Sequence, residues 1–143
     1  MYRKNVFRTL SVSMALALVS LAAQAATLSF KADLKPSDGI SSSGAGTLTA
    51  TLDTDTNTLK YHVEFSGLSG NVTAAHFHGP ATSGQNARPQ VPVTVSPIVS
   101  PLDSTAILTP EQVKDLEDGK WYFNLHTAAN PRGEIRGQVE QVK

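Results

Sequence analysis

The sequence contains no cysteine, and it has no apolar run long enough to cross a bilayer. Without thiols the chain cannot form a disulfide, a cysteine nucleophile, an iron–sulfur cluster or a thiolate metal site. Histidine, aspartate and glutamate are then the remaining candidates for metal ligands. The stability of the fold must come from packing and from closure of its sheet.

The first 25 residues have the three parts of a cleavable export signal. Basic residues lie between Arg3 and Arg8, an apolar run interrupted only by serines covers residues 10–23, and small residues end at Ala25. The run of about 14 residues is shorter than the roughly 20 that a spanning helix needs. We expect cleavage after Ala25 and a secreted or periplasmic mature chain, residues 26–143, without a transmembrane anchor. An uncleaved amphipathic anchor is the alternative.

The chain also lacks an excess of charge of either sign, because 12 Lys and Arg balance 12 Asp and Glu. The signal holds three basic and no acidic residues, so its removal lowers the formal net charge from 0 to about −3. A mildly acidic chain argues against nucleic acid or an anionic membrane as partner. The mature length of about 118 residues suffices for one hydrophobic core, so we expect a single domain over residues 26–143.

Alternation of apolar and polar residues predicts a series of short strands. Pro92 suggests that one of them lies at the edge of a sheet. Thr109, Pro110 and Gln112 form the start signal of a short helix that ends near Gly119. This pattern favours an all-β Greek-key β-sandwich or barrel of about seven or eight strands with one short helix. The predicted strands cover residues 27–34, 47–53, 59–65, 72–78, 90–95, 120–127 and 134–142.

Three of the four histidines lie in two of these strands. His76 and His78 share one strand face, about 6–7 Å apart, because side chains alternate along a strand. If the strand that carries His126 is a neighbour, the three rings form a metal site with an open position, suited to copper or zinc. The alternative is that they only hydrogen-bond on a solvated face. We interpret His62 as an ordinary surface residue, with a role as fourth ligand as the alternative.

Three polar residues are candidates for supporting roles. Asn124 shares the outer face of its strand with Tyr122 and His126. Glu134 and Arg136 lie on one face of the last strand, where we first interpret them as a structural ion pair. The functional alternatives are that Glu134 orients a ligating imidazole, or that Arg136 attracts an anion. The chain has no phosphate-binding loop, nucleophile elbow or zinc-protease helix motif.

Taken together, these motifs resemble the CHRD domain, a family named after chordin. The resemblance implies an all-β domain and an exported location, and it supplies no reaction. The matching segments are residues 67–70 (GLSG), 72–80 (VTAAHFHGP), 108–119, 121–131 (WYFNLHTAANP) and 133–137 (GEIRG).

Residues 67–78 also show a weaker likeness to the Cu,Zn superoxide dismutases. That likeness implies His76, His78 and His126 as copper ligands on the outside of a β-barrel. The chain departs from the dismutases because it has no bridging histidine, no zinc-ligand loop and no disulfide. Those departures put dismutase activity in doubt even if the fold is shared.

The sequence therefore leads to three hypotheses. The first is an exported domain that buffers or sequesters a metal ion, with copper favoured over zinc because imidazole sites bind Cu(II) ahead of Zn(II). The second is a non-enzymatic adhesion or structural module with structural histidines, in which residues 81–89 contact a partner. The third is a redox enzyme similar to superoxide dismutase. We favour a non-enzymatic role.

Overall fold

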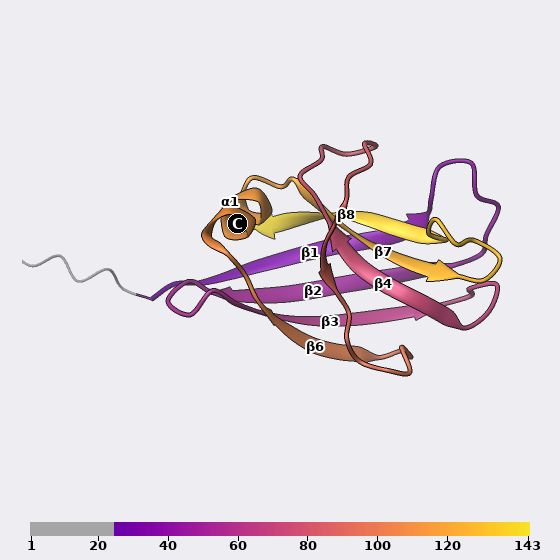
Figure 1. Ribbon diagram of the computed structural model, residues 1–143, viewed down its shortest axis with the longest axis horizontal. Helices are drawn as coiled ribbons and strands as arrows, with labels where there is room; N and C mark the ends of the chain where they lie inside the picture. The colour runs from indigo at the N-terminus through magenta and orange to yellow at the C-terminus, as the bar shows by residue number, and fades with distance from the viewer. Residues whose placement is uncertain (1–24) are drawn as a thin grey trace, which may run out of the picture.

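The computed structural model describes residues 25–143, so all but the last residue of the predicted export signal lies outside the described residues. Neighbouring strands pair antiparallel in one sheet of order β5-β4-β7-β8-β1-β2-β3-β6. The sheet curls so that β4 and β7 lie over β1, β2 and β3 (Figure 1). This confirms the predicted all-β class. The elements are β1 (Thr27–Pro36), β2 (Ala45–Asp53), β3 (Thr58–Ser66), β4 (Val72–His78), β5 (Pro89–Pro92), β6 (Leu102–Ile107), α1 (Pro110–Glu117), β7 (Trp121–Thr127) and β8 (Ile135–Val142).

The core lies between the two curled halves of the sheet. Tyr61 on β3 packs edge-on against Phe77 on β4, with ring centroids 5.0 Å apart. Phe77 also contacts Phe123 at 4.9 Å and Trp121 at 5.7 Å. Each fully buried large apolar side chain contributes about 1.5–3 kcal/mol. This aromatic packing provides stability in a chain without disulfides.

The predicted helix is present as α1. The Thr109 side chain accepts a hydrogen bond from the Gln112 backbone N–H, and the Gln112 side chain accepts one from the Thr109 N–H. This capping box fixes the first turn, and Leu116 is buried against the core. The turn after α1 places Gly119 at a φ of 69°, which favours glycine. Within residues 25–143 no helix is long and apolar enough to cross a membrane.

Two elements differ from the sequence-based prediction. β6 was not predicted, because Ser104 occupies a position opposite Tyr61 and interrupts the apolar alternation. β5 does form an edge strand, as Pro92 suggested, but it ends at Pro92 instead of continuing to Val95. The segment after β5 then runs away from β4 and leads to β6 (Figure 1).

Candidate metal centre

Two neighbouring strands bring three histidines to one outer face of the sheet. β4 pairs with β7, with Ala74 opposite His126 and His76 opposite Asn124. Because side chains alternate across a strand, His76 and His78 share the face that carries His126. The structure thus confirms that the two histidine strands are adjacent, as the metal hypothesis required.

The imidazoles of His76, His78 and His126, here called the His triad, form a compact group. Ring centroids lie 5.1 Å apart for His76 and His126, 5.5 Å for His76 and His78, and 6.1 Å for His78 and His126. One nitrogen from each ring lies within 4.8 Å of the others. A tetrahedral ion with bonds of about 2.0–2.1 Å holds its nitrogens about 3.3–3.4 Å apart. Small side-chain rotations therefore suffice to close the triad on an ion.

Backbone carbonyls fix the tautomers of two of these rings. His78 Nδ1 lies 3.0 Å from the Ala87 carbonyl oxygen, and His126 Nδ1 lies 2.9 Å from that of Pro131. A carbonyl only accepts, so each Nδ1 carries the hydrogen and each Nε2 keeps its lone pair. Among the described residues, His78 Nε2 is buried without a hydrogen-bond partner. Both Nε2 atoms thus keep a lone pair for a metal ion, and that of His78 has no other partner among the described residues.

The third ring of the triad, His76, makes a direct contact with His126. His76 Nδ1 lies 3.2 Å from His126 Nε2, so the N–H of His76 donates to that lone pair. A metal ion would replace this hydrogen bond once the proton of His76 moves to its Nε2. Burial, then the charges of the other two imidazoles, lowers the pKa of His76. Burial also lowers the pKa of His78, although its hydrogen bond to Ala87 opposes that shift. Both rings therefore favour the neutral form that binds metals.

The donor set of the His triad fits a transition metal. Calcium and magnesium prefer oxygen ligands, whereas three imidazoles suit copper or zinc. The buried, unpartnered Nε2 of His78 is the atom that most needs such a partner. No carboxylate or thiolate belongs to the group, so its ligand chemistry is imidazole alone.

One side of the triad is covered by a stack of flat groups. The Tyr122 ring lies parallel to the His78 ring at 4.8 Å, and the Arg136 guanidinium lies 3.6 Å from the Tyr122 centroid. Arg136 also donates to Asn86 Oδ1 at 2.8 Å and to the Gln85 carbonyl at 3.0 Å. Arg136 therefore supports the triad through Tyr122 and holds the loop that follows β4.

That loop, predicted as exposed over residues 81–89, is exposed only in part. Ala81 is buried and Ala87 is half-buried. The Ala81 carbonyl accepts from Gln138 at 2.9 Å, and the Ala87 N–H donates to the Tyr122 hydroxyl at 3.1 Å. These contacts position the Ala87 carbonyl that holds His78.

Asn124 supports the turn that holds His126. Its side chain is 4% exposed, and its Nδ2 donates to the Arg132 carbonyl at 3.4 Å. Gly133 packs so closely that a Cβ there would clash with the side-chain amide of Asn124, and its φ of 116° also favours glycine. Asn124 and Gly133 therefore shape the turn whose Pro131 carbonyl accepts from His126.

The partners of Glu134 in the structure differ from the imidazole or Arg136 that the sequence led us to expect. Its carboxylate contacts no imidazole and makes no ion pair with Arg136 among the described residues. It accepts hydrogen bonds from Ser42 Oγ at 2.6 Å, Ser69 N at 2.8 Å and Thr127 Oγ1 at 2.6 Å, and from the Ser69 hydroxyl. Burial raises the pKa of this carboxyl group, but the hydrogen bonds outweigh it and bring the pKa to about 2. Glu134 is thus an ionised anchor of the β7–β8 turn.

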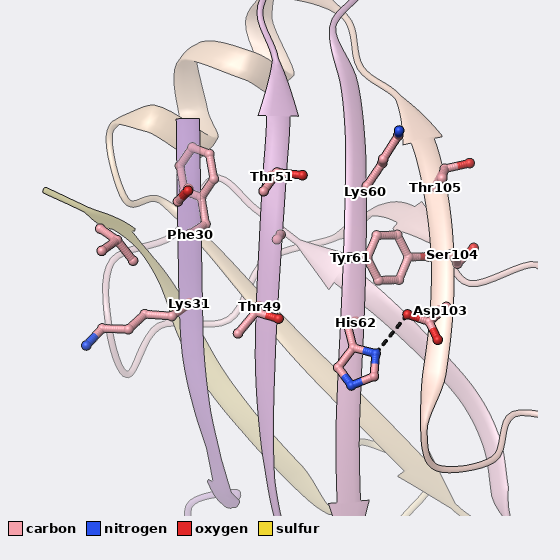
Figure 2. A pocket seen from close by; sticks show the side chains of 13 residues that line it. Phe30, Lys31, Thr49, Thr51, Lys60, Tyr61, His62, Asp103, Ser104 and Thr105 are labelled. Carbon is pink, nitrogen blue, oxygen red and sulfur yellow. Dashed lines mark hydrogen bonds and ion pairs between the residues drawn. The ribbon is translucent and has the colours of Figure 1, made fainter. Parts of the chain in front are cut away.

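The fourth histidine lies elsewhere. His62 is on β3, and its Nδ1 lies 2.7 Å from Asp103 Oδ1 while its Nε2 lies 3.5 Å from Glu64 Oε1. The hydrogen bond to Asp103 is the main cause of its raised pKa. His62 lines an open groove of about 770 Å³ across β1, β2, β3 and β6, in which Thr49 is its neighbour on β2 (Figure 2). It is an outer-face residue, as predicted, and does not belong to the His triad.

The sequence did not reveal the groups that orient the triad. Alternation had placed Tyr122 on the outer face, but nothing indicated that its ring stacks on His78. The carbonyls of Ala87 and Pro131 have no side-chain signature, because any residue supplies a carbonyl. Gly133 was the one available signal, since a glycine next to a predicted strand often marks a close backbone approach.

A family model described as the CHRD domain matches residues 13–139. A search of the curated proteins and a search of the solved structures each found no match. The matched span includes β4 and β7, which carry the His triad, and the turn that contains Pro131.

Proposed function

The chain belongs to the CHRD domain family, and we propose that this member is an exported protein that binds one transition metal ion through the His triad. The ligands are His76 Nδ1, His78 Nε2 and His126 Nε2. The observation that carries the proposal is the convergence of one nitrogen from each ring within 4.8 Å, together with the tautomers of His78 and His126 that backbone carbonyls set.

The main alternative is that the histidines only connect strands in an adhesion or structural module. A structural histidine satisfies its ring nitrogens with protein groups or water. His78 Nε2 is instead buried and unpartnered among the described residues. A buried polar atom without a partner costs about 1–3 kcal/mol. A bound metal ion removes that cost, which favours the metal hypothesis.

We propose copper ahead of zinc as the physiological ion. At a given imidazole site Cu(II) binds more tightly than Zn(II). The triad offers three imidazoles and leaves further coordination positions for water or another small ligand. An excess of Zn(II) should therefore fail to displace equimolar Cu(II) from the protein.

Titration of the metal-free mature chain with Cu(II) tests the site. We expect one ion per chain and an electron paramagnetic resonance spectrum with coupling to nitrogen nuclei. The double variant His76→Ala/His126→Ala should lose affinity by at least about 100-fold, because one imidazole cannot hold the ion. His62→Ala is the matched control and should bind like the wild type. Equal affinity in the double variant would remove the proposed site.

A superoxide-decay assay on the copper-loaded protein distinguishes buffering from enzymatic turnover. We propose that the protein buffers or sequesters its metal, so the decay rate should match that of the metal-free chain. Acceleration that disappears in His76→Ala/His126→Ala would support the dismutase-like alternative.

Export is proposed from the basic start, the apolar run and the small residues that end at Ala25. We expect a protein secreted or periplasmic in location, with Ala26 at its mature N-terminus. Mass spectrometry of fractionated cells that express all 143 residues would identify both the compartment and the mature N-terminus. The uncut mass in the membrane fraction would instead support an amphipathic anchor.

A further inference from the structure

The strand β6 ends the sheet at the side opposite to β5, and β3 is its one neighbour in the strand order. The Leu108 N–H donates to the Asn57 carbonyl on the β3 side at 2.9 Å. Main-chain groups alternate between the two sides of an antiparallel strand, so those of Asp103, Thr105 and Ile107 point away from β3. No backbone–backbone hydrogen bond within residues 25–143 uses them. We call these three residues the β6 edge.

The β6 edge is exposed as well as unpaired. The Asp103 side chain is 76% exposed, Ile107 is 80% exposed, and Thr105 is exposed too. A sheet edge with unpaired N–H and C=O groups is a template for another strand. The exposed Ile107 adds apolar surface that such a strand would remove from water.

The charges beside this edge are incompletely paired. Lys60 on β3 lies opposite Thr105 in the register of β3 with β6 (Figure 2). Among the described residues no carboxylate lies within ion-pair distance of Lys60. Asp103 Oδ1 lies 2.7 Å from His62 Nδ1, whereas Asp103 Oδ2 makes no hydrogen bond in the described part of the chain. The outer face therefore carries an unpaired cation and an available carboxylate oxygen.

We propose that the β6 edge is a dimer interface, at which β6 pairs antiparallel with β6 of a second copy of the chain. The two Ser104 residues lie on the twofold axis of this dimer. Asp103 of each copy then lies opposite Thr105 of the other, and about four main-chain hydrogen bonds cross the interface. Ile107 lies opposite Pro101 of the second copy, which covers its apolar side chain. This inference rests on the β6 edge alone and does not require a bound metal ion.

Charge complementarity favours this register and a second copy as the occupant. Lys60 and Asp103 of different copies flank the same Thr105, with their backbones two strand spacings, about 9–10 Å, apart. A lysine and an aspartate side chain together span that distance, so each Lys60 gains a carboxylate. An axis at Asp103 would instead place two like charges opposite each other, which is destabilising. An axis at Thr105 would place Asp103 against Ile107. A segment of unrelated sequence does not bring a carboxylate to this position.

Sedimentation of the metal-free mature chain between about 10 μM and 1 mM tests the dimer. We expect a reversible monomer–dimer equilibrium. Thr105→Pro should weaken it by about tenfold or more, because proline removes an N–H that faces the second copy and not β3. Thr105→Val is the matched control: it keeps the N–H and a branched side chain, so dimerisation should stay within about twofold of wild type. Urea midpoints confirm that both variants are folded.

Exchange of two charges tests the register. Lys60→Glu and Asp103→Lys should each weaken the dimer by about fivefold or more, since each change affects two symmetric ion pairs. The double variant Lys60→Glu/Asp103→Lys should return dimerisation to within about threefold of wild type. In a mixture of ¹³C-labelled and unlabelled chains, we expect an NMR contact between the Cα hydrogens of the two Ser104 residues. Residues opposite each other in such a pair have Cα atoms about 4.5 Å apart.

Three results would count against the dimer. A chain that stays monomeric at about 1 mM would overturn the proposal, and so would a dimer that Thr105→Pro leaves intact. A double charge variant that dimerises no better than the single variants would overturn the register and the argument for a second copy. If the chain stays monomeric and a strand-forming peptide shifts the amide NMR signal of Ile107, the edge belongs to a different partner, against our proposal.

Discussion

The two histidine sites lie on outward faces of one sheet, but different groups hold their rings. In the His triad, His78 and His126 donate to backbone carbonyls under a covering loop and a turn. In the second site, His62 contacts the exposed carboxylates of Asp103 and Glu64. A carboxylate stabilises the imidazolium far more than a neutral carbonyl does. Burial lowers the pKa of His78 although its hydrogen bond to Ala87 opposes that shift, whereas the hydrogen bond to Asp103 is the main cause of the raised pKa of His62.

This difference shows that neighbours decide what a strand histidine does. A neutral ring with a fixed tautomer presents one lone pair, which is what a metal ion needs. A ring between two carboxylates tends to keep both protons and has no lone pair to offer. The triad should therefore depend on buried supports, whereas the His62 site should not.

Removal of the Glu134 charge gives the largest expected difference between the two regions. Glu134→Gln should lower the free energy of unfolding at pH 7 by about 3 kcal/mol, because buried donors then lose an ionised acceptor. The pKa in the folded state is about 2, below the usual 4.5. The carboxylate thus stabilises the fold above pH 4.5, and this contribution is lost as the pH falls toward 2. Urea unfolding between pH 2 and 7 measures both effects.

Asp103→Asn is the control for Glu134→Gln, because the Asp103 side chain is 76% exposed. Its urea midpoint at pH 7 should stay close to that of the wild type. Similar losses in both variants would show that the supports of the two regions do not differ.

Substitution of Gly133 should weaken the triad without touching a ligand. In Gly133→Ala the new Cβ displaces the Asn124 amide and moves the turn that carries the Pro131 carbonyl. We expect copper affinity to fall by about 10–100-fold, the usual loss when a group that orients a ligand is removed. Long-range ¹H–¹⁵N NMR of the metal-free protein should also show that His126 no longer keeps its hydrogen on Nδ1.

Gly70→Ala is the matched control for Gly133→Ala. A Cβ on Gly70 meets no atom within 4 Å, and its φ is not in the left-handed region. This variant should keep both the copper affinity and the tautomer of His126. An unchanged tautomer in Gly133→Ala would show that the turn does not orient the ring, whether or not copper binds.

Most of the fold could be predicted because its signals are local. Alternation located the long strands, and the box formed by Thr109 and Gln112 located α1. β6 was missed because Ser104 interrupts its apolar pattern. The end of β5 was misplaced because the apolar alternation continues past Pro92, whereas the strand ends there and only the Val93 N–H still bonds β4, at the Ala75 carbonyl.

The candidate site could also be predicted only where its signals are local. His76 and His78 were predictable as a pair because two residues on one strand share a face. The approach of His126 depended on the pairing of β4 with β7, which is a long-range property that alternation does not encode. The partners of Glu134 come from two distant loops, at Ser42 and Ser69, so its role could not be inferred from its own strand.

The smallest expected effect concerns stability: as the pH changes, the contributions of His76 and His62 to the free energy of unfolding should change in opposite directions. The pKa of His76 is lowered from 6.5, so the unfolded chain binds more protons and stability is lost as the pH falls below 6.5. The pKa of His62 is raised from 6.5, so its contribution is present below 6.5 and is lost as the pH rises above it. Urea midpoints of the metal-free protein between about pH 5 and 8 measure both slopes. His62→Ala should flatten only the branch above pH 6.5, and His76→Ala should flatten the branch below it. If both variants flatten the same branch, the rings do not differ in the charge state that the fold favours.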